Sequence, residues 1–192
     1  FRMKKDIYQI QLSLNGSKPR IWRRLVIASN ILLADFHKVI QTAMGWENYH
    51  LHHFVVGDVF YAPKTKGDLF WDDMNDIDYK KVRLHDLLQV ENDKILYEYD
   101  FGDGWLHTIT LEKILPPDPT FKYPICLTGK MRCPPEDSGG IEGYINLLAN
   151  LQDIKSPGYD EAADWLGTEY DPNYFDKEEI NTLLRSKNYG CF

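Results

Sequence analysis

Apolar and polar residues alternate along the first part of the chain. Residues 6–14 and 20–27 each alternate, and a turn sequence at Asn15-Gly16 separates them. A period of two is typical of a half-buried strand, so the two stretches predict an antiparallel pair. Residues 49–56 and 59–62 repeat the pattern on either side of a Gly-Asp turn and predict a second hairpin.

Helical spacing replaces this alternation in other segments. Apolar residues recur at helical spacing over residues 32–43, with Ser29 or Asn30 available as an N-cap and Gly45 placed to end the helix. Residues 84–88 predict a short helical turn. Three later helices are predicted, over residues 142–151, over residues 159–166, and after Asp176, where Glu179 completes a capping-box pattern.

The remaining segments are predicted to lack regular structure. Residues 63–81 are polar and predict a long surface loop, and prolines and glycines interrupt residues 116–140. Strands joined by hairpins, one early helix and a run of late helices predict an α+β fold with a largely antiparallel sheet. We expect one domain over residues 1–192, with the sheet and early helix in 3–115, the irregular segment in 116–140 and the C-terminal helices in 141–188.

Residues 97–109 are the stretch richest in unusual side chains. Aromatic and β-branched residues flank a turn sequence from Asp100 to Gly104, which predicts a further hairpin. Its tip gathers Asp100, Asp103, Trp105 and His107. Two carboxylates, an indole and an imidazole are typical of a functional site, but they do not fix a reaction.

Composition excludes several classes of protein. The 192 residues are 43% hydrophobic and 27% charged, as in ordinary soluble proteins, and no apolar run approaches the roughly 20 residues of a membrane span. We therefore expect a cytoplasmic protein without a membrane partner. Three cysteines form an odd set that does not indicate a disulfide framework.

The charge is unevenly distributed. The net charge of −7 argues against general nucleic-acid affinity, because phosphate binding draws on Lys and Arg. Residues 1–40 nevertheless carry eight Lys or Arg against two Asp, which is +6, so the rest of the chain carries −13. This basic N-terminal segment is either a polar partner interface or a solvated surface, and we favour the latter.

Four short sequences resemble a known family. They are residues 19–24 (PRIWRR), 45–54 (GWENYHLHHF), 99–107 (YDFGDGWLH) and 133–140 (CPPEDSGG), the last followed by Gly143-Tyr144. Together they are similar to the plasmid ORF-three-like family, first described from a root-inducing plasmid and also known as insertion-sequence passenger proteins. The resemblance covers nearly the whole chain. It implies a compact α+β domain, genes in bacteria and archaea that sometimes lie on mobile elements, and no established biochemical activity.

His50 and His52 suggest a metal site. Residues i and i+2 of a strand share a face, and two imidazoles placed there can chelate one zinc ion. Asp100 and Asp103 are the predicted carboxylate ligands of a divalent metal. Further ligands could come from His107, Cys126, Cys133, Glu136 and Asp137, if the fold brings these residues together. The alternative is that the histidines pack under Trp46 or Phe54 and donate to backbone carbonyls.

A structural zinc site on the cysteines is disfavoured. Cys126 and Cys133 are too far apart for a tight C-x-x-C pair, and many family members resemble this chain but have Cys where it has Ser138. Asp100 and Asp103 also have two interpretations. They could hold a divalent ion or do acid–base chemistry, or they could accept backbone hydrogen bonds in a tight turn.

The loop over residues 134–140 could cradle an anion at the start of the helix that follows it. Glu136 and Asp137 would repel an anion, so we expect these acids to cap the helix or to reach a basic group such as Arg23 or Arg24. Those two arginines alternate to opposite faces of a strand.

The function that the sequence favours is a cytoplasmic binding or accessory domain. Its cleft for a protein partner or small polar ligand would be framed by Trp46, Trp105, Asp100, Asp103 and Glu136. One alternative is a metal-dependent hydrolase or nuclease that uses His50, His52, Asp100 and Asp103. The other is a DNA-binding accessory protein, associated with mobile elements, that binds through the basic N-terminal segment.

Overall fold

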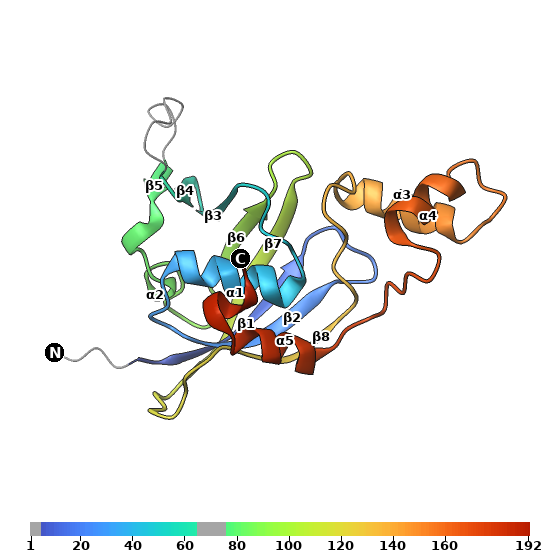
Figure 1. Cartoon of the computed structure of the whole chain (residues 1–192). Coiled ribbons are helices and arrows are strands. Elements are labelled where there is room, and N and C mark those ends of the chain that lie inside the picture. Colours follow the sequence, from blue (N-terminus) through green and yellow to red (C-terminus); the bar gives the residue numbers. More distant parts are fainter. Residues whose placement is uncertain (1–4, 65–75) are drawn as a thin grey trace.

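An eight-stranded sheet forms the centre of the protein in the computed structural model, which describes residues 5–64 and 76–192 (Figure 1). The strand order is β5-β4-β3-β6-β7-β1-β2-β8, and every neighbouring pair is antiparallel except β4 and β5. The predicted α+β class with a largely antiparallel sheet is confirmed. The strands are β1 (Ile7–Leu14), β2 (Trp22–Ala28), β3 (His52–Val56), β4 (Val59–Ala62), β5 (Asp76–Asp78), β6 (Lys94–Tyr99), β7 (Trp105–Leu115) and β8 (Ile125–Lys130).

The helices occupy two places. α1 and α5 lie against the sheet, whereas α3 and α4 pack on each other beyond its end (Figure 1). No helix in the described ranges is long and apolar enough to cross a membrane. The helices are α1 (Leu33–Met44), α2 (Leu84–Leu87), α3 (Gly140–Leu151), α4 (Tyr159–Leu166) and α5 (Lys177–Leu184), with short 3₁₀ helices η2 (Tyr79–Lys81) and η3 (Lys187–Gly190).

One face of the sheet carries the core. Alternate residues of the central strands point to this face, so Leu12 of β1 lies opposite Ile109 of β7, and Tyr97 of β6 lies opposite Phe54 of β3. The apolar side of α1 covers them, with Phe36 fully buried. The opposite face is polar. There the Arg24 guanidinium donates two hydrogen bonds to the Glu112 carboxylate, at 2.7 and 2.9 Å.

The predicted N-cap of the first helix is wrong. α1 begins at Leu33, and Leu32 before it offers no side-chain cap. Ser29 and Asn30 are not in the cap position because residues 29–33 form backbone hydrogen bonds with residues 82–85 instead. The other end is as predicted, since Gly45 has a left-handed backbone with φ 110°.

Two segments predicted as loops contain strands. β8 lies within residues 116–140 and pairs with β2 at the edge of the sheet. Pro and Gly are frequent on both sides of β8, so the sequence does not predict its six residues as a strand. In the predicted 63–81 loop, residues 76–81 form β5 and η2, and residues 65–75 lie outside the described part of the chain.

Candidate metal centre

Three loops meet at one end of the sheet. The end of β6 lies beside the segment before β3, because the backbone N–H of Asp100 donates to the carbonyl of Leu51 at 2.9 Å. The tip of the β6–β7 hairpin also contacts the loop before α3, where the Gly139 N–H donates to an Asp103 carboxylate oxygen at 3.1 Å. A Cβ atom at Gly140 would lie 2.6 Å from the Asp103 carbonyl oxygen, so this close approach requires glycine.

The three loops bring one imidazole and three carboxylates together. The Nε2 atom of His50 lies 3.0 Å from Oδ1 of Asp137, 3.6 Å from Oδ2 of Asp100 and 3.8 Å from Oε2 of Glu136. One ligand atom each from His50, Asp100 and Asp137 lies within 4.8 Å of the other two. Within residues 5–64 and 76–192, this is the only such group of His, Cys, Asp or Glu.

Two polar atoms in this cluster are buried and form no hydrogen bond. They are Nε2 of His50 and Oε2 of Glu136, which are two of the four such side-chain atoms in the described ranges. The Glu136 side chain is only 10% exposed. Leaving a buried polar atom unpaired costs about 1–3 kcal/mol and is rare in folded proteins. Two such atoms facing one another therefore distinguish this place from an ordinary polar surface.

Each of the two buried carboxylates has one oxygen fixed by the protein. Oδ1 of Asp100 accepts from two backbone N–H groups of the hairpin turn, at 3.0 and 3.4 Å. Oε1 of Glu136 accepts from the backbone N–H of Glu47 at 2.7 Å and from the Tyr99 hydroxyl at 2.9 Å. The second oxygen of each carboxylate is left facing His50. Such outer contacts orient the ligands in metal sites.

The backbone is unusual at both aspartates that face His50. Asp100 has φ 59° and Asp137 has φ 55°, in the left-handed region that residues other than glycine adopt infrequently. Asp and Asn tolerate this region best, but it still costs free energy, and such residues are concentrated at functional sites. The sequence places an aspartate in each of two left-handed positions of this one cluster.

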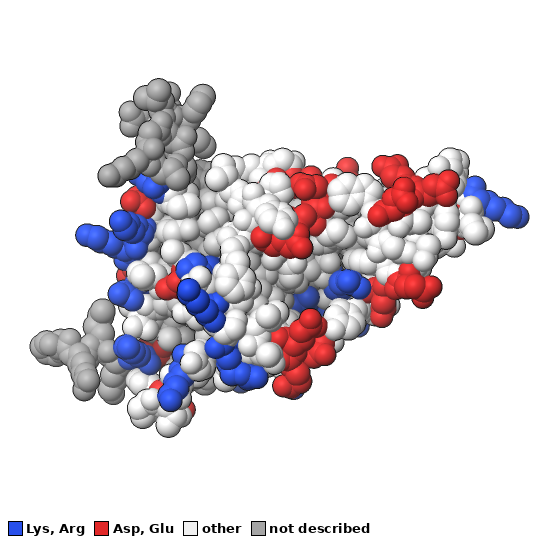
Figure 2. Space-filling model, viewed as in Figure 1, with Lys and Arg blue, Asp and Glu red and all other residues white. Residues whose placement is uncertain are grey.

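The electrostatic environment is strongly acidic. No Lys or Arg nitrogen in the described ranges lies within 4 Å of the Asp100, Glu136 or Asp137 carboxylates. Burial raises the pKa of Glu136 above its ordinary value. Burial and the adjacent Glu136 carboxylate likewise raise the pKa of Tyr99. Figure 2 shows Asp and Glu gathered over the centre and right of this view, and Lys and Arg mainly on its left.

His52 and Asp103, predicted as ligands beside His50 and Asp100, are not brought into the cluster. The His52 ring stacks on His37 at a centroid distance of 3.4 Å, and its Nε2 bonds to the Tyr79 hydroxyl at 2.7 Å. Burial lowers the pKa of His52 to about 2. Asp103 instead fixes the loop before α3, as described above.

The aromatic residues predicted for a cleft lie in the core. Trp46 is 5% exposed, and Trp105 and His107 are fully buried. The Trp46 indole N–H donates to Nε2 of His107 at 3.3 Å, and Nδ1–H of His107 donates to the carbonyl of Tyr97 at 3.2 Å. These bonds fix the neutral tautomer of His107, and burial lowers its pKa to about 4. The Trp46 ring packs against Tyr99 and Trp105, with centroid distances of 5.4 and 5.0 Å, and neither indole faces solvent.

The predicted pairing of the acidic loop with Arg23 or Arg24 does not occur. Arg23 is buried and donates to backbone carbonyls, including that of Ala43 at 2.8 Å, at the end of α1. Arg24 pairs with Glu112 on the other face of the sheet. Sequence reasoning also missed Tyr99, whose hydroxyl fixes Glu136. The alternating pattern of β6 could have identified Tyr99, because it directly precedes Asp100 and lies opposite Trp105 in the hairpin.

The fold and this cluster together define a class of α+β protein with a mostly antiparallel sheet and an acidic, histidine-containing centre at one end. The chain belongs to the plasmid pRiA4b ORF-3-like protein family, whose model matches residues 6–179. It is similar to the uncharacterised protein y4hQ of Sinorhizobium fredii, with 34% identity over 185 residues that span 95% of this chain and 92% of that protein. It is also similar to the crystal structure of a protein of unknown function, MM3350 from Methanosarcina mazei Go1. That match has 38% identity and a TM-score of 0.82, and covers 92% of this chain and 98% of the other.

Proposed function

We propose that this protein binds one divalent metal ion between His50, Asp100 and Asp137, and that the ion activates water for hydrolysis. The observation that carries the proposal is that Nε2 of His50 and Oε2 of Glu136 are buried, lie 3.8 Å apart and form no hydrogen bond, although Nε2 lies 3.0 Å from Oδ1 of Asp137. A divalent cation held by His50, Asp100 and Asp137 would coordinate Nε2 and would offset the charge of the nearby Glu136 carboxylate. It would also offset three carboxylate charges that have no Lys or Arg partner in the described ranges.

The ligand set indicates the kind of metal. One imidazole nitrogen with carboxylate oxygens suits ions such as Zn²⁺ or Mn²⁺, whereas the softer thiolate sites need cysteines that this cluster lacks. The Asp137 side chain is 60% exposed, so solvent reaches one side of the centre. An ion held there would keep open coordination positions, as in catalytic sites, and would lower the pKa of a bound water.

Two other functions expected from the sequence receive less support. Trp46 and Trp105, which the sequence predicts as the aromatic walls of a ligand cleft, are both buried in the core. In the basic N-terminal segment, Arg23 and Arg24 already have protein partners and Lys38 pairs with Asp35. Fewer cations are therefore left for phosphate contacts, and the acidic surface around the centre opposes DNA as a substrate.

The first experiment is elemental analysis of protein purified without a histidine tag, before and after dialysis against a chelator, followed by calorimetric titration with Zn²⁺ and with Mn²⁺. We expect one equivalent to bind. Loss of an outer-shell partner typically weakens metal binding by about 10–100-fold, so His50→Gln and Asp137→Asn, which remove ligands, should weaken it at least as much.

His53→Gln is the matched control. His53 also bonds to a carboxylate, that of Glu98 at 2.8 Å, but lies outside the cluster, so this variant should bind metal like the wild type. Equal binding by His50→Gln and the wild type would refute the metal site. Metal binding without metal-dependent turnover of p-nitrophenyl acetate or bis(p-nitrophenyl) phosphate would count against the hydrolytic part.

A further inference from the structure

The loops that carry the metal centre expose apolar side chains to solvent. Tyr49 and Leu51, on either side of His50, are 72% and 66% exposed, and Phe101, which directly follows Asp100, is also exposed. The chain segments of Leu51 and Phe101 lie side by side, because the Asp100 N–H donates to the Leu51 carbonyl at 2.9 Å. Apolar side chains gathered at one exposed place are typical of surfaces that bind other molecules. We call Tyr49, Leu51 and Phe101 the apolar rim of the metal centre.

A pocket opens beside the same centre. It has a volume of about 290 Å³, and Asp137 lines it as well as facing His50. Residues of α3 and α4 form its walls, and α4 contributes Glu161 and the exposed Trp165. These two residues lie four positions apart in a helix, so their side chains share one face. The pocket therefore combines an aromatic ring and a carboxylate next to a proposed metal ligand.

The charged side chains that line this pocket are acidic. They are those of Asp137 and Glu161, and no Lys, Arg or His among the described residues lines it. The surrounding segment has the same sign, because residues 136–171 carry nine Asp or Glu against one Lys, which is −8, so the rest of the chain carries +1. Figure 2 shows acidic side chains gathered where Figure 1 places α3 and α4. A carboxylate beside an aromatic face is suited to a Lys or Arg side chain, through an ion pair and a cation–π contact.

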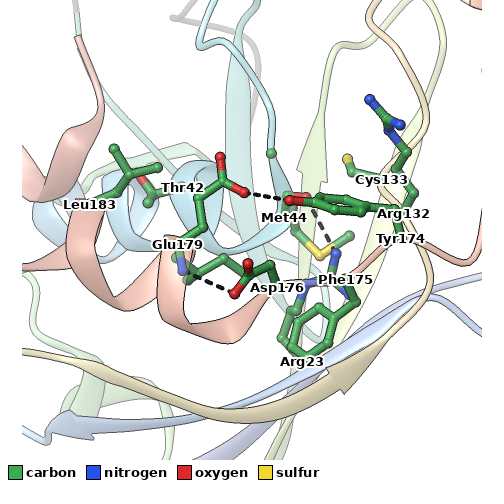
Figure 3. Close-up of a pocket in the computed structure, with 12 residues that line it drawn as sticks. Arg23, Thr42, Met44, Arg132, Cys133, Tyr174, Phe175, Asp176, Glu179 and Leu183 are labelled. Carbon is green, nitrogen blue, oxygen red and sulfur yellow. Dashed lines mark hydrogen bonds between the residues drawn. The ribbon is translucent and has the colours of Figure 1, made fainter. Parts of the chain in front are cut away.

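The pocket between α1 and α5 does not select a charge in this way (Figure 3). It is lined by cations and acids together, which are Arg23, Arg132, Asp176 and Glu179. In Figure 3, Arg132 and Glu179 lie on opposite sides of the Tyr174 ring. A preference for cations is therefore a feature of the pocket beside the metal centre and not of every pocket on this protein.

We propose that the substrate of the metal centre is an extended polypeptide in which a Lys or Arg residue lies close to apolar residues. This inference rests on the proposed hydrolytic function and adds the class of substrate. The apolar side chains of the substrate would contact the apolar rim, and its basic side chain would enter the pocket of Glu161 and Trp165. An extended chain can reach both places, because each residue adds about 3.3 Å.

The charge of this surface argues against two other partners of an apolar rim. Nucleic acids and anionic membranes carry negative charge, and residues 136–171 would repel them. A polypeptide can supply apolar and cationic groups in one chain. In its hydrolysis the oxygen of water bonds to the carbonyl carbon, the C–N bond breaks, and the leaving nitrogen takes the proton that water releases.

The test compares three capped octapeptides by NMR titration of the ¹⁵N-labelled full chain without metal. The first peptide contains Leu, Phe and two Lys residues, the second has Gln in place of both Lys, and the third has Ser in place of Leu and Phe. We expect the first to bind in the millimolar range or tighter and to shift the indole signal of Trp165. Each altered peptide should bind about tenfold more weakly, because it loses either the charge-assisted or the apolar contacts.

Variants assign the two preferences to their residues. Glu161→Gln should remove the preference for Lys over Gln in the peptide, and Leu51→Ser should reduce the preference for Leu and Phe over Ser. Glu169→Gln is the matched control for charge, because Glu169 is exposed in the same acidic segment but does not line the pocket. Val90→Ser is the control for the apolar rim, because Val90 is exposed before the start of β6, at the opposite end of that strand from Asp100.

Three results would each overturn the proposal: no binding of the first peptide at millimolar concentration, equal binding of all three peptides, or unchanged preferences in Glu161→Gln and Leu51→Ser. Binding to phosphatidylcholine vesicles that Leu51→Ser abolishes would assign the apolar rim to a lipid surface and would overturn it too. Cleavage of the first peptide with Zn²⁺ or Mn²⁺, detected by mass spectrometry, tests the reaction separately. Peptide binding without metal-dependent cleavage would support recognition of polypeptides and contradict the hydrolytic function.

Discussion

At the scale of single residues, the carboxylates of the metal centre have divided roles. One oxygen of Asp100 accepts backbone hydrogen bonds of the turn, which is the structural role that the sequence predicts as one alternative. The other oxygen faces His50. Glu136 follows the same pattern, with one oxygen fixed and one unpaired. The structural and the ligand interpretation of such a residue are therefore compatible, because a carboxylate has two oxygens.

Buried histidines make stability depend on pH. Burial lowers the pKa values of both His37 and His107 to about 4 in the folded state, whereas the ordinary value is 6.5. Both are neutral at pH 7. As the pH falls below 6.5, these histidines become protonated in the unfolded chain, whereas in the folded protein they stay neutral until about pH 4. The free energy of unfolding therefore decreases between pH 6.5 and pH 4.

The difference between 6.5 and about 4 corresponds to about 3 kcal/mol for each histidine. Urea unfolding at several pH values between 7 and 4 should therefore show a steep decline in the free energy of unfolding. His107→Gln should flatten this decline by at most about 1.4 kcal/mol per pH unit. A variant with the wild-type slope would show that His107 is not kept neutral by the fold.

At the scale of elements, one side chain of α5 forms two hydrogen bonds to the edge strand of the sheet, beside the apolar packing of Leu184. Asn181 accepts from the Cys126 N–H at 2.7 Å and donates to the Cys126 carbonyl at 3.0 Å. It thereby pairs backbone groups of β8 where the register with β2 shifts between Arg24 and Leu25. Both Asn181 and Cys126 are buried.

We expect Asn181→Leu to destabilise the protein by about 2–4 kcal/mol, because it leaves a buried N–H and a buried carbonyl unpaired. Denaturant unfolding measures this change. Thr182→Ala, at the next position on the exposed side of α5, should change stability by less than about 0.5 kcal/mol. Similar effects of the two substitutions would mean that Asn181 is not what attaches the helix to β8.

At the scale of the whole molecule, the metal centre joins parts of the chain that are far apart in sequence. His50 precedes β3, Asp100 follows β6, and Asp137 lies between β8 and α3. A bound ion would connect all three segments in the folded state only. Because it binds the folded protein, it should also stabilise that state by mass action.

A free metal concentration of 100 times Kd should raise the free energy of unfolding by about 2.7 kcal/mol. Thermal unfolding with and without Zn²⁺ or Mn²⁺ measures the effect, and Asp137→Asn should abolish most of it. His53→Gln should keep the wild-type response. A stabilisation that persists in Asp137→Asn would place the ion elsewhere in the protein.

Local patterns along the chain were sufficient to predict several elements. Period two predicted β1, β2 and the β6–β7 hairpin, and Asp176 with Glu179 correctly marked the start of α5. β8 was missed because a six-residue edge strand flanked by Pro and Gly has little local signal, and its position depends on β2 and Asn181.

The composition of the site depends on long-range packing. The sequence identified His50, Asp100, Glu136 and Asp137 as candidates, but it could not exclude His52 or Asp103, because spacing along a strand does not reveal which side chains a distant loop will meet. Contacts between loops selected the cluster, including the close approach of Gly140 to Asp103. Residue types along the chain indicate the candidate residues of a site, and long-range packing determines which of them lie together.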